Sequence, residues 1–158
     1  MQTRALSCAG FNFHPIDSRT AYRWAGQVLY RSNNQGDGWF LCSAQLPHKA
    51  VVKQVRFTVK DAFDRIDVRY CALVRVPLSP TGQQIQVLAV MSSTGVAAKP
   101  GIVRLSDTSI DFATVDNANY TYYLQCQIYF DPTLAAIGGA YAGIIGADVT
   151  YTISAADG

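Results

Sequence analysis

The stretch Tyr120-Thr-Tyr-Tyr-Leu-Gln-Cys-Gln-Ile-Tyr-Phe130 decides the fold class of this chain. Apolar or aromatic side chains occupy every second position, namely Tyr120, Tyr122, Leu124, Cys126, Ile128 and Phe130. The positions between them hold threonine, two glutamines and two further tyrosines. Successive side chains of a β-strand point to opposite faces of its sheet, so this pattern predicts a long strand with one buried face.

The same alternation recurs on both sides of this stretch. Long runs cover residues 51–59, 68–76, 85–91 and 144–153, and shorter candidates cover 27–31, 39–45, 102–105 and 108–114. Segments rich in Gly, Asn, Asp and Pro separate them, most clearly residues 33–38. Roughly eight to ten strands with such turns predict an all-β fold, an antiparallel two-sheet β-sandwich of jelly-roll type. A closed barrel is the alternative.

The phase of two alternating runs predicts which residues are buried. In residues 51–59, Val51, Val55 and Phe57 share one face. In the last run, Ile145 and Ala147 fall on the apolar side and Ile144 on the other. We therefore expect Ile144 to point away from the core.

Composition agrees with a β protein of one domain. The chain has 158 residues, of which 49% are hydrophobic and 15% charged, and its formal net charge is +2. High apolar content and low net charge exclude a disordered chain. All 11 acidic residues are Asp and Lys is scarce, which disfavours a helical bundle. We expect a single domain over residues 1–158, with residues 1–10 as a loose N-terminal arm.

Charge and hydropathy argue against nucleic acid and membrane as partners. A net charge of +2 without a run of Lys or Arg provides no electrostatic footprint for a phosphate backbone. The most apolar stretch, residues 137–147, is broken by Gly and shorter than the ~20 residues that a spanning helix requires. The N-terminus lacks the apolar core of a signal peptide, so a secreted form would have lost its leader.

Four cysteines are dispersed along the chain, at Cys8, Cys42, Cys71 and Cys126. They form no CxxC motif and no Cys/His cluster, so we expect neither a zinc site nor another cofactor. Three disulfide pairings are possible, and the spacing does not choose among them. Cys126 lies on the apolar side of its strand, and we expect it to be a free, buried thiol.

Catalytic motifs are missing from the sequence, and we expect no enzyme. His14 and His48 are the only histidines, and neither lies near a recognisable nucleophile motif. The clustered carboxylates Asp61, Asp64 and Asp67 suit a loop better than the paired acids of a glycosidase.

Aromatic and amide side chains gather around residues 33–38. Candidate ligand-binding residues are Trp24, Asn33, Asn34, Asp37 and Trp39. A flat ring can stack on the C–H face of a sugar while amides and carboxylates bond its hydroxyls. This pattern predicts a carbohydrate-binding module as the alternative function.

The leading hypothesis is self-association. Its candidate contact residues are Tyr123, Tyr129, Tyr141 and Ile144. These aromatic and apolar side chains fall on nominally outward positions or in the apolar stretch of the last third, and such surfaces usually have a partner. We expect a homo-oligomeric, non-enzymatic subunit of an extracellular fibre, appendage or particle coat.

Four short motifs resemble a group of bacterial secreted or surface β-sandwich domains of uncharacterised function. They are Phe13-His14-Pro15, Leu46-Pro47-His48-Lys49-Ala50-Val51-Val52, Val115-Asp116-Asn117-Ala118-Asn119-Tyr120-Thr121-Tyr122 and Val149-Thr150-Tyr151. Lys49 departs from the group, which has Gly at this position, and the cysteines are not part of its pattern. The resemblance implies a β-sandwich in an extracellular or surface setting and transfers no active site.

Overall fold

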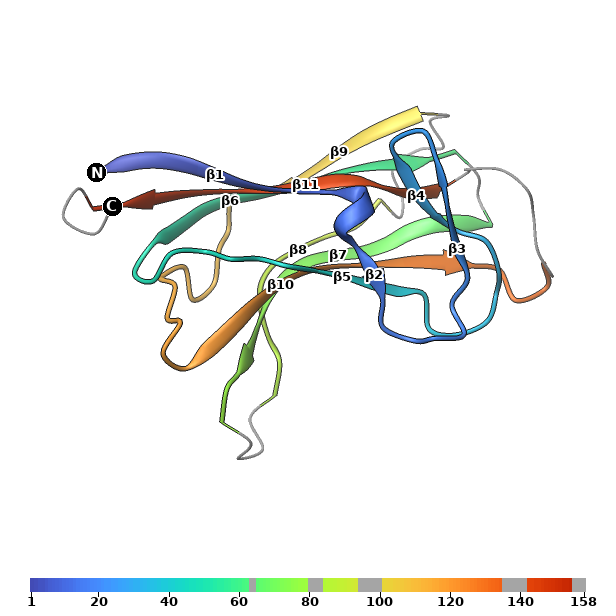
Figure 1. Ribbon diagram of the computed structural model, residues 1–158. Helices are drawn as coiled ribbons and strands as arrows, with labels where there is room; N and C mark the ends of the chain where they lie inside the picture. Colours follow the sequence, from blue (N-terminus) through green and yellow to red (C-terminus); the bar gives the residue numbers. More distant parts are fainter. Residues whose placement is uncertain (63–64, 80–83, 94–100, 135–141, 155–158) are drawn as a thin grey trace.

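Two antiparallel sheets packed face to face make up the fold in the computed structural model (Figure 1). The structure describes residues 1–62, 65–79, 84–93, 101–134 and 142–154. It confirms the all-β prediction of a two-sheet sandwich of jelly-roll type. Among the described residues, no helix is long and apolar enough to cross a membrane.

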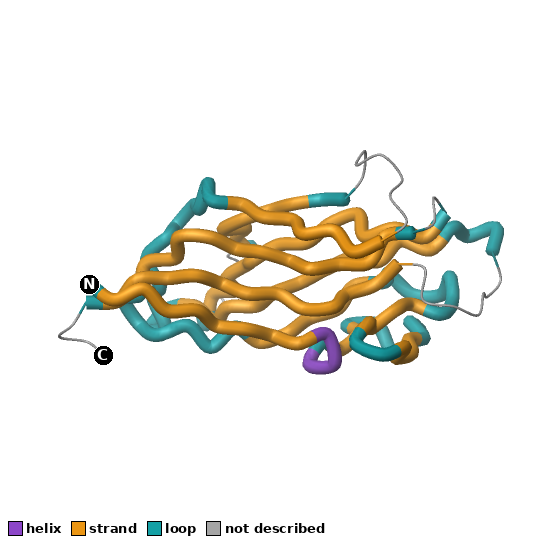
Figure 2. The backbone as a smooth tube through the Cα atoms, turned by 90° about the horizontal axis from the view of Figure 1, so that it is seen from above, coloured by secondary structure: helices purple, strands orange, loops and turns teal. Residues whose placement is uncertain are grey.

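The first sheet, sheet A, has six strands. Their order is β3 (Tyr22–Ala25), β4 (Val28–Arg31), β11 (Ala142–Ile153), β6 (Val51–Asp61) and β9 (Gly101–Asp107), and β1 (Gln2–Ala9) also pairs with β11. Because β6 pairs along most of one edge of β11, β1 and β4 share its other edge. Figure 2 shows these strands side by side from above, with the 3-10 helix η1 (Gly10–Asn12) following β1.

The second sheet, sheet B, has five strands. Their order is β2 (His14–Pro15), β5 (Trp39–Ser43), β10 (Tyr120–Phe130), β7 (Ile66–Pro77) and β8 (Gln86–Met91). The central strand β10 contains the alternating stretch with which the sequence argument begins. Its buried and half-buried residues alternate from Thr121 to Phe130, as that alternation predicts.

The hydrophobic core fills the space between the two sheets. Phe13, Phe40, Phe57, Leu124 and Ile128 are among its fully buried side chains. Burying a side chain of this size contributes about 1.5–3 kcal/mol relative to leaving it in water.

Bulges overturn part of the predicted phase. The pairing of β11 with β6 shifts at Ile144/Gly146 and again at Thr150/Tyr151. Each shift moves the residues beyond it to the opposite face. On β11, Ile144 is therefore buried instead of Ile145, and on β6, Val52 is buried instead of Val51. The expected strand over residues 108–114 is also wrong: apart from an isolated bridge at Thr114, this segment is a loop.

The N-terminal residues form a strand rather than the expected loose arm. Residues Gln2–Ala9 pair with β11 from Ile153 to Gly146 without a register shift. Leu6 packs against the core and Cys8 is buried. The backbone hydrogen bonds of this pairing fix the segment in place.

The four cysteines form two disulfides. Cys8 of β1 is bonded to Cys42 of β5, so this bridge joins sheet A to sheet B. Cys71 and Cys126 are opposite each other on β7 and β10 and form the second bridge. The expectation of a free thiol at Cys126 is therefore wrong, because the register of two neighbouring strands places a second cysteine beside it.

Candidate functional site

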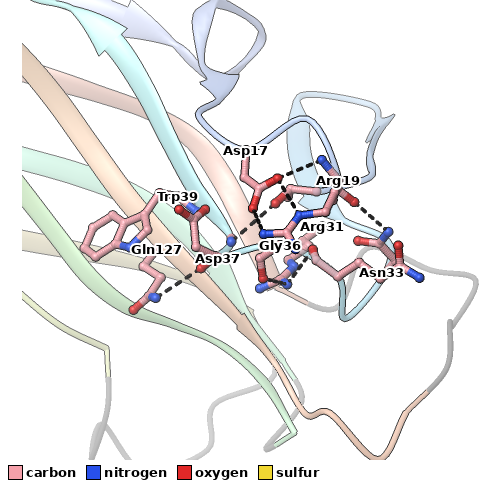
Figure 3. Close-up of polar contacts among 11 residues, drawn as sticks. Asp17, Arg19, Arg31, Asn33, Gly36, Asp37, Trp39 and Gln127 are labelled. Carbon is pink, nitrogen blue, oxygen red and sulfur yellow. Dashed lines mark hydrogen bonds and ion pairs between the residues drawn. The ribbon is translucent and has the colours of Figure 1, made fainter.

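The side chain of Arg31 forms hydrogen bonds with the polar loop over residues 32–38 (Figure 3). Arg31 is buried, and its guanidinium donates to the carbonyl oxygen of Ile128 at 2.9 Å. It also donates to the carbonyl oxygens of Gln35 and Gly36, both at 2.9 Å. Desolvation lowers the pKa of Arg31, while attraction from Asp37 and Asp17 opposes this shift. Arg31 thus acts as an internal anchor of the loop.

Asn33 and Asn34 are engaged in contacts that shape the same loop. Asn33 accepts a hydrogen bond from the backbone N–H of Ala21 at 2.9 Å and donates to the carbonyl of Arg19 at 3.0 Å. The amide of Asn34 donates to the carbonyl of Pro132 at 3.0 Å. Such contacts are how Asn side chains stabilise turns. They give both amides a structural role.

Asp37 and Gly38 complete the turn into β5. One carboxylate oxygen of Asp37 accepts the backbone N–H of Trp39 at 3.0 Å. Gly38 has a φ of 71°, and a Cβ there would lie 2.5 Å from the carbonyl oxygen of Ile128. Because the Ile128 carbonyl lies so close and the backbone is left-handed, only glycine fits at position 38. The turn sets the direction in which Trp39 enters sheet B.

An ion pair lies in the neighbouring segment, where the Arg19 carbonyl accepts a hydrogen bond from Asn33. Arg19 donates to both carboxylate oxygens of Asp17, at 3.1 and 2.7 Å. These hydrogen bonds lower the pKa of Asp17 from 3.8 to about 2. The carboxylate is therefore ionised well below neutral pH, and the adjacent Arg19 balances its charge.

The structure separates the two tryptophans that the sequence argument combined. Trp24 lies on β3, the edge strand of sheet A, and is 42% exposed. Its neighbours are Phe11 and Tyr22, each with its ring centroid 6.4 Å from that of Trp24. Trp39 lies on β5 of sheet B. Five predicted ligand-binding residues therefore do not form one cluster.

A second set of aromatic and amide side chains lies on the outer face of sheet B, which we call the sheet B face. The residues that define it are Trp39 on β5, Tyr70 on β7, and Tyr123, Gln125 and Gln127 on β10. All five are half-buried and alternate with core residues such as Phe40 and Cys126. Gln127 is opposite Trp39 on one side and Tyr70 on the other. The sheet register therefore places rings on both sides of an amide.

Two contacts order this row of side chains. The rings of Trp39 and Tyr70 meet edge to face with their centroids 5.3 Å apart. The amide of Gln127 donates to the backbone carbonyl of Asp37 at 3.1 Å (Figure 3). Burial raises the pKa of the Tyr70 hydroxyl, so this group remains a neutral hydrogen-bond donor at physiological pH. The row presents oriented rings and neutral polar groups.

A charged cluster marks the end of the sheet B face beyond Gln127. The guanidinium carbon of Arg69 lies 3.3 Å from the centroid of the Tyr129 ring, and Arg69 also donates to Asp67 at 3.2 Å. Desolvation raises the pKa of Asp67 although the charge of Arg69 opposes the shift. Arg69 occupies a position over the Tyr129 ring, which limits that ring as a stacking surface.

Sequence reasoning missed Tyr70, Gln125 and Gln127. In a regular strand Tyr70 would share the buried side of Val68, but the pairing of β7 with β10 shifts at Gln127/Ile128. That shift turns Tyr70 outward, opposite Gln127. The two glutamines lie on the polar side of the β10 alternation, which is the signal that could have pointed to them.

The residues predicted for self-association are not on one surface. Tyr123 and Tyr129 are half-buried on the outer side of β10. Ile144 is fully buried, because the bulge that follows it turns its side chain into the core. Tyr141 lies outside the described residues. Self-association stays a prediction for the two outward tyrosines and is wrong for Ile144.

The two histidines lie in different parts of the structure. His48 accepts the backbone N–H of Asn117 through Nδ1 at 3.1 Å, whereas His14 lies on the short strand β2. Within the described ranges, no group of three or more His, Cys, Asp or Glu could hold a metal ion.

Comparison with known proteins supports the fold. The structure is similar to the xylan-binding module CBM15, with a TM-score of 0.60 over 98% of this chain and 100% of that one. It is also similar to the C-terminal CBM6 of LamC, a marine laminarinase from Zobellia galactanivorans, with a TM-score of 0.53 over 93% and 99% of the two chains. Identity is 11% in both cases. No family model matches the sequence, and no curated protein matches it.

Proposed function

We propose that this protein is a non-catalytic carbohydrate-binding module whose sugar site is the sheet B face. The observation that carries the proposal is the register of that face, where Gln127 is opposite both Trp39 and Tyr70. Tyr123 and Gln125 continue the same side of β10. Aromatic rings and amides thus lie side by side on one face of sheet B.

This arrangement suits the chemistry of a sugar. A pyranose has apolar C–H faces that pack on an aromatic ring and hydroxyls that both donate and accept hydrogen bonds. Glutamine amides also donate and accept, so Gln125 matches such hydroxyls, and Gln127, whose amide N–H is bonded to the Asp37 carbonyl, offers its side-chain oxygen as an acceptor. A binding surface needs a few placed polar groups among apolar area, and the sheet B face supplies both.

Two further findings support the proposal. The structural neighbours are carbohydrate-binding modules, one of them described as xylan-binding and the other as part of a laminarinase. Two disulfides are typical of an oxidising compartment, which agrees with an extracellular or cell-surface setting where polysaccharides occur.

A glycan array tests the proposal directly. The array should include neutral polysaccharides such as xylan and laminarin beside charged ones. We expect the intact protein to bind at least one polysaccharide and a Gln127→Ala variant to lose at least half of that signal. Absence of binding to every glycan would exclude the function.

A further inference from the structure

The outer side of sheet A, onto which Figure 2 looks, presents polar and charged residues. On β6 and β9 these residues alternate with core side chains such as Phe57 and Leu105, because successive side chains of a strand point to opposite faces. We call this surface the sheet A face and define it by Arg56, Thr58 and Lys60 on β6, Ile102, Arg104 and Ser106 on β9, and Asp148 and Thr150 on β11.

The strand register places three cations of the sheet A face close together. Arg104 is opposite Thr58, which is the outward residue between Arg56 and Lys60. Diagonal neighbours on paired strands lie about 7–8 Å apart, so Arg104 is near both other cations. Arg56 and Lys60 are about 14 Å apart along β6 at ~3.4 Å per residue. The sequence has no run of basic residues, and strand pairing gathers these three.

Among the residues that define the sheet A face, Asp148 is the one acid. It accepts hydrogen bonds from Nε and Nη2 of Arg56, both at 2.9 Å, so this pair is nearly neutral. Within the described parts of the chain, neither Lys60 nor Arg104 takes part in an ion pair or a side-chain hydrogen bond. Two positive charges of this face are therefore unbalanced.

The acids that end β6 and β9 lie on the other side of the sheet. Asp61 accepts a hydrogen bond from the hydroxyl of Ser93, and Asp107 accepts one from the backbone N–H of Val90 at 3.1 Å. Val90 lies on β8 of sheet B, and Ser93 follows that strand. Both carboxylates are thus directed away from the sheet A face.

An anionic ligand matches this grouping of charges. Like charges on neighbouring strands repel, whereas an ammonium or guanidinium binds a carboxylate through charge-assisted hydrogen bonds. The hydroxyls of Thr58, Ser106 and Thr150 belong to the same face and can donate to and accept from sugar hydroxyls. The residues that define the face include no aromatic ring on which a nucleic-acid base could stack. Charge and hydroxyls together favour an acidic polysaccharide.

We infer that the sheet A face is a second polysaccharide site, which binds a uronate-containing chain through Lys60 and Arg104. This site goes beyond the proposed function, because it lies on the opposite side of the sandwich from the sheet B face and selects its ligand by charge. The outer faces of the two sheets point away from each other, so one molecule can hold two polysaccharide chains at once.

Calorimetric titration of the full chain with polygalacturonate tests this inference. The control ligand is fully methyl-esterified polygalacturonate, which has the same backbone without the charge. We expect binding of the acid but not of the ester. Raising the NaCl concentration from about 50 to about 500 mM should weaken binding at least about tenfold, because salt screens exposed charges. Trp39→Ala should leave this binding unchanged.

A pair of double variants assigns the binding to the sheet A face. Lys60→Gln/Arg104→Gln should bind polygalacturonate about tenfold more weakly, since it removes both unbalanced cations. Arg4→Gln/Lys49→Gln changes the net charge equally at two exposed residues outside this face and should bind as the parent does.

Three results would overturn the inference. Equal losses in both double variants would show that binding follows net charge alone. Unchanged affinity of Lys60→Gln/Arg104→Gln would show that these cations only protect the edge strand β9 from pairing with other chains. If the intact protein does not bind polygalacturonate, the second site does not exist, and the neutral polysaccharides of the glycan array still test the sheet B face.

Discussion

Trp39 and Tyr70 meet edge to face at 5.3 Å although their strands are not neighbours. Strand β10 runs between β5 and β7, and its Gln127 is opposite both residues. The two rings therefore approach each other across a strand. An edge-to-face pair contributes about 0.5–1.5 kcal/mol beyond the area it buries. The pair fixes the orientation of both rings on the surface to which we assign sugar binding.

A pair of tryptophan variants distinguishes the sheet B face from the other exposed aromatic surface. Trp39→Ala should weaken binding of the best array ligand by at least about tenfold, since it removes the largest ring of the site. Trp24→Ala is the matched control and should bind as the parent does, because Trp24 lies on β3 of sheet A. Affinity electrophoresis measures both. If Trp24→Ala weakens binding and Trp39→Ala does not, the sugar site lies instead on the surface formed by Phe11, Tyr22 and Trp24.

Arg31 should stabilise the fold through its hydrogen bonds to three backbone carbonyls. Arg31→Met leaves the carbonyls of Ile128, Gln35 and Gly36 without this donor and should lower the free energy of unfolding by about 3 kcal/mol. The control Arg23→Met changes an exposed residue and should stay within about 0.5 kcal/mol. Urea denaturation measures both values. Equal midpoints for the two variants would show that Arg31 does not anchor the loop.

The two disulfides should contribute similarly to stability. Their closed loops separate the paired cysteines by 34 and 55 residues. The loop-entropy account gives about 4 kcal/mol for each, so replacing either pair by alanine should lower the unfolding free energy by that amount. Chemical denaturation of each double variant checks the value, and a loss below about 1 kcal/mol would contradict it.

Reduction should distinguish the same two bridges. Cys8 and Cys42 border an open hollow of about 380 Å³, whereas Cys71 and Cys126 are both fully buried between the sheets. A thiol reductant needs access to a sulfur, so the first bridge should open earlier. Alkylation followed by mass spectrometry at increasing reductant concentration gives the order. Labelling of Cys71 and Cys126 before Cys8 and Cys42 would contradict this order of reduction.

Titration of Asp17 gives a prediction for acid pH. Its folded pKa of about 2 lies below the ordinary value of 3.8, so its favourable contribution is complete above pH 3.8. This contribution is lost as the pH falls through about 2. Arg19→Ala removes the main partner and should return the pKa of Asp17 toward 3.8, measured by NMR of the side-chain carboxyl carbon. An unchanged pKa would show that the ion pair is not formed in solution.

Much of the fold could be predicted from alternation alone. The pattern of β10 identified its buried side because no bulge interrupts its pairing with β5 and its apolar run is long. The sequence could not show which side of β11 is buried at its beginning. A bulge depends on how two strands pair. The residues around Ile144 do not indicate that the pairing skips Ile145, so that Gly146 is opposite Thr58.

The candidate site was harder to predict than the fold, for the same physical reason. Trp39 and the outward Tyr123 were recognisable as surface aromatics, but the partner of Trp39 is Tyr70, which is distant in sequence and turned outward by a register shift. Asn33 and Asn34 resembled ligand-binding amides because turn-forming and sugar-binding asparagines look alike in sequence. Only their backbone partners show that they shape the loop.

Chemical-shift mapping of a bound oligosaccharide on the ¹⁵N-labelled protein tests the central claim most directly. We predict that the largest shifts fall on Tyr123, Gln125 and Gln127 of β10 and on the indole N–H of Trp39, with β3 unaffected. Shifts confined to β3 and the loop over residues 32–38, or none at saturating ligand, would contradict sugar binding by the sheet B face.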